Sequence, residues 1–147
     1  MENSEKNIIM LMNDISKMFH SEMKKRTNED SKMVTYRPIL HMLIRYDGCN
    51  QLDVAKYTML KAPTISITLR NMEADGLIKK VCDEEDKRNV RIFLTDKGKE
   101  QNEKIRVICD NLKNDILTGI DESKQEEVKK VLLKIINNLE DLKWKKC

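Results

Sequence analysis

The sequence is poor in aromatic residues, in glycine and in proline. Aromatic side chains make up 4% of the 147 residues, and there are four glycines and two prolines. A β-sandwich or barrel needs many turns and many aromatic strand residues, so this composition argues against both and favours long helices. The chain also has no apolar run near the roughly 18 residues that a membrane helix needs. We therefore expect a soluble, mostly α-helical protein of about one domain, with no membrane partner.

Features of secreted proteins are missing as well. Residues 1–6 lack the basic start of a secretory signal, and no long apolar stretch follows them. The four cysteines form no Cys-x-x-Cys pair and no zinc-like spacing; they are Cys49, Cys82, Cys109 and Cys147. We predict a cytoplasmic protein in which these residues are unpaired and unreactive thiols.

Groups typical of enzymes and of metal sites are equally scarce. The chain has two histidines, His20 and His41, and neither a phosphate-binding glycine-rich loop nor a nucleophile elbow. A metal site built from these histidines and Glu22 is the less favoured interpretation, because the histidines belong to different predicted helices. We therefore expect no catalytic residue, no metal and no cofactor.

Charge does not by itself identify a partner. The 28 basic and 25 acidic side chains give a formal charge of +3, and they are mixed along the whole chain with no basic tail or stripe. Non-specific affinity for nucleic acid depends on a local basic patch more than on the sum. Any argument for DNA must come from the order and pattern of the predicted elements.

Both ends of the chain carry apolar residues at steps of three and four, which predicts amphipathic helices. The first covers residues 4–25. A long helix begins after the N-cap Thr95, breaks near Gly119 and restarts at Asp121. The apolar stripes of these last two helices consist of Ile105, Ile108, Leu112 and Ile116, and of Val128, Val131, Leu132, Ile135, Leu139 and Leu142.

The middle of the chain predicts short helices followed by a hairpin. A helix over 33–46 contains Pro38, so it either starts or kinks there. Asn50 caps a helix over 51–59, and another runs from Pro63 to the terminating Gly76. Alternating apolar residues over 77–82 and 90–94 then predict two strands joined by a charged loop. This order is that of a helix-turn-helix followed by a wing.

The second short helix has a predictable outer face. Taking Ile65, Leu69 and Met72 as the inward stripe, a step of 100° per residue turns the other positions outward or to the flanks. A major groove admits such a helix, and its hydroxyl, amide and guanidinium groups can donate to phosphates or base edges. The predicted DNA contacts of this helix are Thr64, Ser66, Ile67, Arg70 and Asn71.

Residues 51–98 resemble the winged helix-turn-helix of the MarR family of bacterial transcriptional regulators. The resemblance rests on Gln51-Leu52-Asp53-Val54-Ala55, on Leu60-Lys61-Ala62-Pro63-Thr64-Ile65-Ser66, and on Met72-Glu73-Ala74-Asp75-Gly76-Leu77-Ile78. Its most specific part is the wing, where Asp86-Lys87-Arg88 precedes Leu94-Thr95-Asp96-Lys97-Gly98. These segments match the family pattern of Asp-x-Arg followed by Leu-Thr-x-x-Gly.

The resemblance implies a fold and a function. Residues 1–147 would form one MarR-like domain, an α+β winged helix, with a DNA-binding lobe over 33–98 and a helical dimerisation region over 1–32 and 99–147. It implies a homodimeric regulator, most often a repressor, on a pseudo-palindromic site in double-stranded DNA. A small effector, often anionic or phenolic, commonly releases the DNA in this family, and Tyr36, Arg37 and His41 are candidates for binding it.

Two details of the interface stay open at this stage. The resemblance implies that Asp86 orients Arg88 by an ion pair while Arg88, with Lys87 and Arg91 beside it, reaches the minor groove; the alternative is a simply solvated loop. Many family members carry Arg where this chain has Ile67. That residue either contacts thymine methyl groups or packs against a neighbouring element.

The low net charge and the acidic run at 83–86 keep one alternative function in view. In that alternative the chain is a helical protein–protein adaptor whose winged lobe does not bind DNA.

Overall fold

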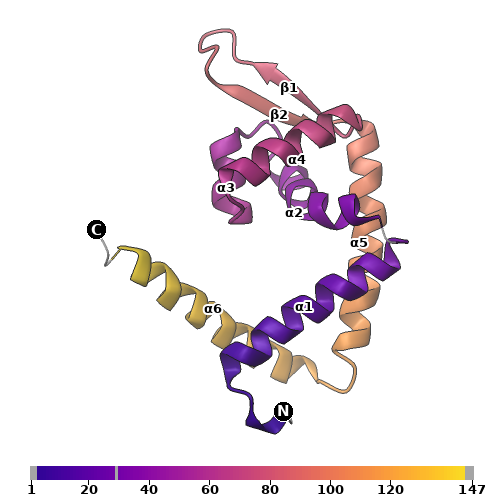
Figure 1. Cartoon of the computed structure of the whole chain (residues 1–147), viewed down its shortest axis with the longest axis vertical. Helices are drawn as coiled ribbons and strands as arrows, with labels where there is room; N and C mark the ends of the chain where they lie inside the picture. The colour runs from indigo at the N-terminus through magenta and orange to yellow at the C-terminus, as the bar shows by residue number, and fades with distance from the viewer. Residues whose placement is uncertain (1–2, 29, 145–147) are drawn as a thin grey trace. The chain divides into compact units, whose positions relative to one another are not determined.

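The computed structural model describes residues 3–28 and 30–144. Over these residues it contains a short 3-10 helix, six α-helices and one two-stranded sheet, which is the predicted winged-helix class (Figure 1). The elements in order are Asn3–Glu5 (3-10), α1 (Ile8–Arg26), α2 (Ser31–Arg45), α3 (Gln51–Thr58), α4 (Ala62–Ala74), β1 (Ile78–Cys82), β2 (Val90–Leu94), α5 (Asp96–Ile116) and α6 (Glu122–Trp144). None of the helices in these ranges is both long and apolar enough to cross a membrane.

The chain forms two structural units, Met1–Leu112 and Lys113–Cys147. The first contains the helix-turn-helix and the hairpin, and the second contains α6. The resemblance instead predicts a division by function, into a DNA-binding lobe over 33–98 and a dimerisation region over 1–32 and 99–147. That division remains a prediction.

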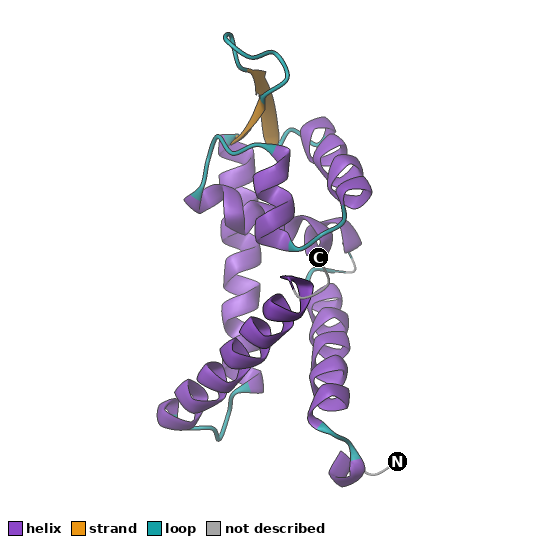
Figure 2. Ribbon diagram, turned by 90° about the vertical axis from the view of Figure 1, so that its left-hand side faces the viewer, coloured by secondary structure: helices purple, strands orange, loops and turns teal. Residues whose placement is uncertain are grey.

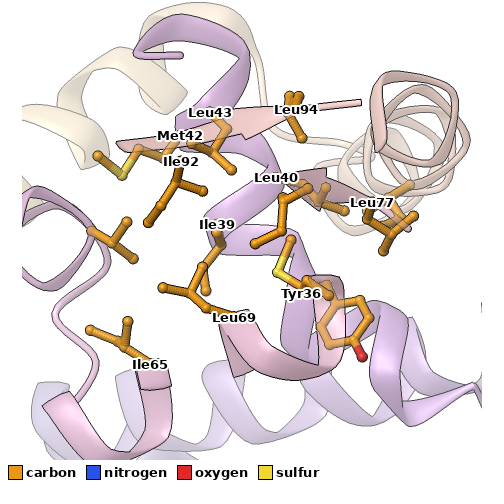
Figure 3. Close-up of a cluster of buried hydrophobic side chains, with 14 of the residues drawn as sticks. Tyr36, Ile39, Leu40, Met42, Leu43, Ile65, Leu69, Leu77, Ile92 and Leu94 are labelled. Atoms are coloured by element: carbon orange, nitrogen blue, oxygen red, sulfur yellow. The ribbon is translucent and has the colours of Figure 1, made fainter. Parts of the chain in front are cut away.

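The core of the first unit is centred on α2. Its residues Ile39, Leu40 and Leu43 are fully buried and meet Ile65 and Leu69 of α4 (Figure 3). Leu77 and the strand residues Ile92 and Leu94 close the same cluster. The predicted inward stripe of α4 is therefore confirmed. Burial of this apolar surface makes the main favourable contribution to the free energy that holds α4 and the hairpin against α2.

Local signals set the ends of α3 and α4. Asn50 and Asp53 form a complete capping box, in which each side chain accepts from the other residue's backbone amide. Gly76, at φ +76°, ends α4 in a Schellman motif. The amide of Leu77 donates to the carbonyl of Met72 at 2.9 Å, and that of Gly76 to Glu73 at 3.0 Å.

The hairpin is antiparallel, with Ile78 opposite Leu94 and Cys82 opposite Val90. Its loop extends well beyond the helices of the lobe (Figure 2). The base is fixed by a feature that the sequence did not predict: Cys49, in the turn after α2, forms a bridge with Ile92. The Ile92 amide donates to the Cys49 carbonyl at 2.8 Å, and the Gly48 amide donates to the Ile92 carbonyl at 2.8 Å. The base of the wing is therefore tied through β2 to the turn that follows α2.

Several predicted boundaries differ from the structure. The first long helix begins at Ile8 and not at residue 4. The helix α2 starts at Ser31, with Asp30 as N-cap, and continues through Pro38, so the predicted alternative in which the proline starts the helix is wrong. Burial of the neighbouring residues Ile39 and Leu40 compensates for the lost hydrogen bond. The helix predicted over 51–59 ends one residue earlier, at Thr58. Met59 is its C-cap and has the left-handed conformation, at φ +57°.

Candidate nucleic-acid interface

The predicted contact residues of α4 lie on one exposed strip. Thr64, Ile67, Arg70 and Asn71 are exposed, and Ser66 is half-buried beside them. Opposite them, Ile65, Leu69 and Met72 are buried in the core. The outer face of α4 therefore offers two hydroxyls, an amide, a guanidinium and one apolar side chain, which is the set of groups that can read a major groove.

Ile67 is the apolar member of this strip. It is 57% exposed, and it borders an open hollow of about 310 Å³ between α2 and α4. Polar residues dominate the rest of the lining: Lys32, Thr35, Tyr36, Thr64, Thr68 and Asn71. Ile67 is thus partly in contact with the lobe and partly free, and both predicted roles remain compatible with its position.

The C-terminal end of α4 is fixed by polar contacts to Asp75. The Tyr36 hydroxyl donates to the Asp75 carboxylate at 2.8 Å, and Lys32 lies 3.7 Å from the same carboxylate. Lys97 Nζ donates to the Asp75 backbone carbonyl at 2.8 Å. Burial, together with the hydrogen bond to Asp75, raises the pKa of Tyr36, so this hydroxyl remains a proton donor. The orientation of α4 is therefore set by α2 and α5.

The wing carries its basic residues in two different settings. Lys87 and Arg88, in the loop, are exposed and form no ion pair among the described residues. Arg91, on β2, lies 3.7 Å from the Asp83 carboxylate and donates to the Gly48 carbonyl at 3.5 Å, with its side chain still 52% exposed. The loop cations are free for a partner, whereas Arg91 also stabilises the base of the wing.

Asp86 contacts Arg88, but through the backbone. The Asp86 carboxylate accepts from the Arg88 amide at 3.0 Å, and its carbonyl accepts from the Asn89 amide at 2.8 Å. This is an Asx turn, in which a short acidic side chain closes a tight loop. Within the described residues, this contact with the Arg88 backbone replaces the expected ion pair between Asp86 and the Arg88 guanidinium. Asp86 shapes the loop, and the Arg88 side chain extends from it.

Part of the acidic run is engaged within the wing. Asp83 accepts from the Glu85 amide at 3.0 Å and pairs with Arg91. Two of the four acids, Asp83 and Asp86, therefore have structural contacts, which reduces the repulsion that the sequence alone suggests between this run and a phosphate backbone.

Sequence reasoning missed one contact of the strip. Gln51, the first residue of α3, donates from Nε2 to Ser66 Oγ at 2.7 Å. The pair is separated by 15 residues, and nothing in the sequence links Gln51 to the predicted DNA contact Ser66. Only the crossing of α3 and α4 brings them together.

The three candidate effector-binding residues lie in different surroundings. Tyr36 faces Asp75, while the Arg37 guanidinium lies 5.5 Å from the centre of the Phe19 ring, and His41 is exposed. Arg37 and His41 do not line the hollow that Tyr36 borders. Successive helix residues are about 100° apart, which separates the first two around α2. The structure does not bring the three residues together.

Neither Cys49 nor Cys109 is an activated thiol. Burial raises the pKa of both Cys49 and Cys109, and the nearby Arg37 guanidinium only partly opposes this at Cys109. Cys82 is exposed and, like these two, unpaired, whereas Cys147 lies outside the described residues. The described residues also contain no group of three or more potential metal ligands.

Comparison with known proteins extends these observations. A family model described as transcriptional regulator SarA/Rot matches residues 33–105. The HTH-type transcriptional regulator TtmR of Methylorubrum extorquens is 32% identical over 68 residues, which span 45% of this chain and 35% of TtmR. The chain therefore matches only about a third of that relative's length.

Solved structures match almost the whole chain. The transcriptional regulator PA3341 is 30% identical, with a TM-score of 0.79 over 92% of this chain and 99% of that one. The MepR–DNA complex of S. aureus is 26% identical, with a TM-score of 0.76 over 90% and 96%. A MarR protein from Peptoclostridium difficile has the same fold, at 18% identity and a TM-score of 0.80 over 100% and 96%.

Proposed function

Since the chain belongs to the MarR family of winged helix-turn-helix transcriptional regulators, we propose that it represses transcription in the cytoplasm as a homodimer bound to a pseudo-palindromic DNA site. The matched family and relatives are transcriptional regulators, and one structural neighbour, MepR, is known in complex with DNA, which supports DNA binding by this chain. The proposal concerns its assembly, its contacts with DNA and the sign of regulation.

One observation carries the proposed mode of binding: polar donors on α4 and free cations on the wing belong to the same lobe. In this proposal Thr64, Ser66, Ile67, Arg70 and Asn71 enter the major groove. Lys87 and Arg88 reach the neighbouring minor groove or its phosphates, and Arg91 contacts the backbone nearer the wing base. Asp86 presents Arg88 by closing the loop.

Homodimer formation is supported by apolar faces that each unit leaves uncovered. On α1, Ile8, Ile15 and Met18 are 63%, 63% and 71% exposed. On α6 the exposed apolar residues include Val128, Val131, Leu139 and Leu142, and the second unit has its own apolar groove of about 510 Å³. Exposed apolar stripes of this length are costly in water, at about 25 cal/mol per Å². A second copy of the chain is the proposed cover.

DNA binding can be tested by fluorescence anisotropy with duplexes selected from a random library by the wild-type protein. We expect specific binding by two protomers per duplex, an affinity that falls steeply with rising salt, and footprints of two half-sites about one helical turn apart. An adaptor without DNA-binding function would select no sequence and show no salt-dependent specific binding. That outcome would reject the proposal in favour of the adaptor.

The role proposed for Ile67 predicts a contact with a thymine methyl group. Replacing the contacted thymine by uracil deletes that methyl alone, so we expect a loss of about 0.8 kcal/mol in binding free energy at that position. The control is Ile67→Ala, which should bind the thymine and uracil duplexes equally well. If uracil has no effect at any position of the site, Ile67 acts through packing in the lobe.

The proposal includes release of the DNA by a small anionic or phenolic effector, which rests on family membership. Tyr36, Arg37 and His41 remain candidate contacts for it. Of these, Tyr36 is the one tied directly to α4, through Asp75.

A further inference from the structure

The exposed strip of α4 has two flanks, and different elements adjoin them. On one flank Ser66 contacts Gln51 of α3, which also borders a hollow of about 280 Å³ between α3 and the wing residue Arg88. On the other flank Thr64 and Asn71 border the hollow of about 310 Å³ between α2 and α4. Residues two apart are about 200° apart around a helix, so Thr64 and Ser66 point to nearly opposite sides.

In the described part of the chain, Lys32 is the one charged residue that borders the hollow between α2 and α4. Its side chain is 62% exposed, and Nζ lies 3.7 Å from Asp75 Oδ2, which is too far for a hydrogen bond. The Tyr36 hydroxyl already donates to the same oxygen, at 2.8 Å. An ammonium group has three protons to donate and no lone pair, so Lys32 can meet a further partner only as a donor and a positive charge.

The position of Lys32 fits one wall of the major groove. The groove is about 12 Å wide, and a helix with its side chains has nearly the same width, so the flanks of a bound helix lie against the phosphates on both sides. We propose that the hollow between α2 and α4 receives a DNA phosphate, which Lys32 binds from α2 while Thr64 and Asn71 donate to it from α4. This inference rests on the proposed binding of α4 in the major groove, and it adds α2 to the interface.

A phosphate contact contributes to affinity and carries no sequence information. We therefore expect Lys32→Gln to weaken binding to the selected duplex about fivefold per half-site, and to make the salt dependence shallower by about one charge per protomer. A selection repeated with this variant should recover the same sequence as the wild type. Lys32→Arg keeps the charge and the donors, so it should bind within about twofold of the wild type.

The matched control is Lys104→Gln on α5. The Lys104 side chain is 63% exposed, close to the value for Lys32, and it also pairs with one carboxylate, that of Glu100 at 3.1 Å. The control removes the same charge from a helix that the proposal does not place against DNA, so the affinity and its salt dependence should stay nearly unchanged. Equal affinities of Lys32→Gln and Lys104→Gln would overturn the inference. Equal thermal unfolding midpoints exclude a general structural effect.

Asp75→Asn separates a DNA contact of Lys32 from an effect on α4 through the Asp75 carboxylate. The amide oxygen of this variant can still accept from Tyr36, whereas the charge that attracts Lys32 is gone. If Lys32 binds a phosphate, Lys32→Gln should weaken DNA binding about fivefold in the Asp75→Asn background as well. If Lys32 only positions α4 through Asp75, Lys32→Gln has no further effect in that background, and the inference is overturned.

Duplexes with one neutral methylphosphonate at a time locate the contact. At one position the replacement should weaken binding by the wild type and have little effect on Lys32→Gln. This phosphate should differ from any that depends on Arg88 in the same way, since the two residues adjoin opposite flanks of α4. If no methylphosphonate depends on Lys32, or if the same one depends on both residues, the inference is overturned while the proposed function stands. If the wild type selects no duplex, the proposed function fails and the inference fails with it.

Discussion

Gly98→Ala is expected to lower the free energy of unfolding of the winged lobe by about 3 kcal/mol or more. Gly98 is buried in the first turn of α5, and a Cβ atom there would overlap the Leu77 carbonyl oxygen and lie 2.9 Å from Leu94 Cδ2. The Leu77 carbonyl cannot easily move away, because it accepts the Thr95 amide at 3.1 Å. Urea denaturation followed by circular dichroism measures the change.

The matched control is Lys99→Ala, the next residue of the same helix, whose side chain is exposed. It should leave the free energy of unfolding within about 0.5 kcal/mol of the wild type. If Gly98→Ala unfolds at the same denaturant concentration as Lys99→Ala, the close approach of α5 to Leu77 does not exist in solution. The glycine of the Leu-Thr-x-x-Gly pattern is thus explained by packing against a backbone carbonyl.

Arg88→Ala is expected to weaken binding to the selected duplex by at least about 1 kcal/mol per half-site. The guanidinium extends from a loop closed by Asp86 and forms no ion pair among the described residues, so its removal costs the fold little. The salt dependence should also become shallower by about one charge per protomer, because fewer counterions are released. Fluorescence anisotropy over a salt series measures both effects.

The control for Arg88→Ala is Arg106→Ala, which also removes one positive charge, but from α5. The Arg106 guanidinium lies 2.7 Å from the carboxylates of Glu103 and Asp110. This control should leave the DNA affinity nearly unchanged. Unchanged affinity for Arg88→Ala, with the circular dichroism spectrum intact, would remove Arg88 from the interface.

Much of the fold could be predicted because its signals are local. The Asn50–Asp53 capping box and the terminating Gly76 lie within a few residues of the ends that they determine. Local reasoning left two alternatives open at Pro38, and the one in which the helix starts there is wrong, because burial around the proline outweighs the lost hydrogen bond. The bridge between Cys49 and Ile92 was also beyond prediction, since it joins residues 43 positions apart.

In the candidate site, too, some features could be predicted from the sequence and others could not. The exposed strip of α4 follows from helical periodicity and the buried stripe of Ile65, Leu69 and Met72. The partners of individual side chains do not follow, because they depend on how elements cross. Gln51 with Ser66, and Tyr36 with Asp75, are pairs that no spacing in the sequence indicates.

The two ends of α4 are held by different kinds of contact. Tyr36, Lys32 and Lys97 hold the C-terminal end through Asp75, whereas the N-cap residue Lys61 makes no side-chain capping bond in the described structure. The first turn is held instead by the burial of Ile65 in the core. The position of the end that carries Thr64 therefore depends on apolar packing, and the position of the opposite end depends on hydrogen bonds and charge.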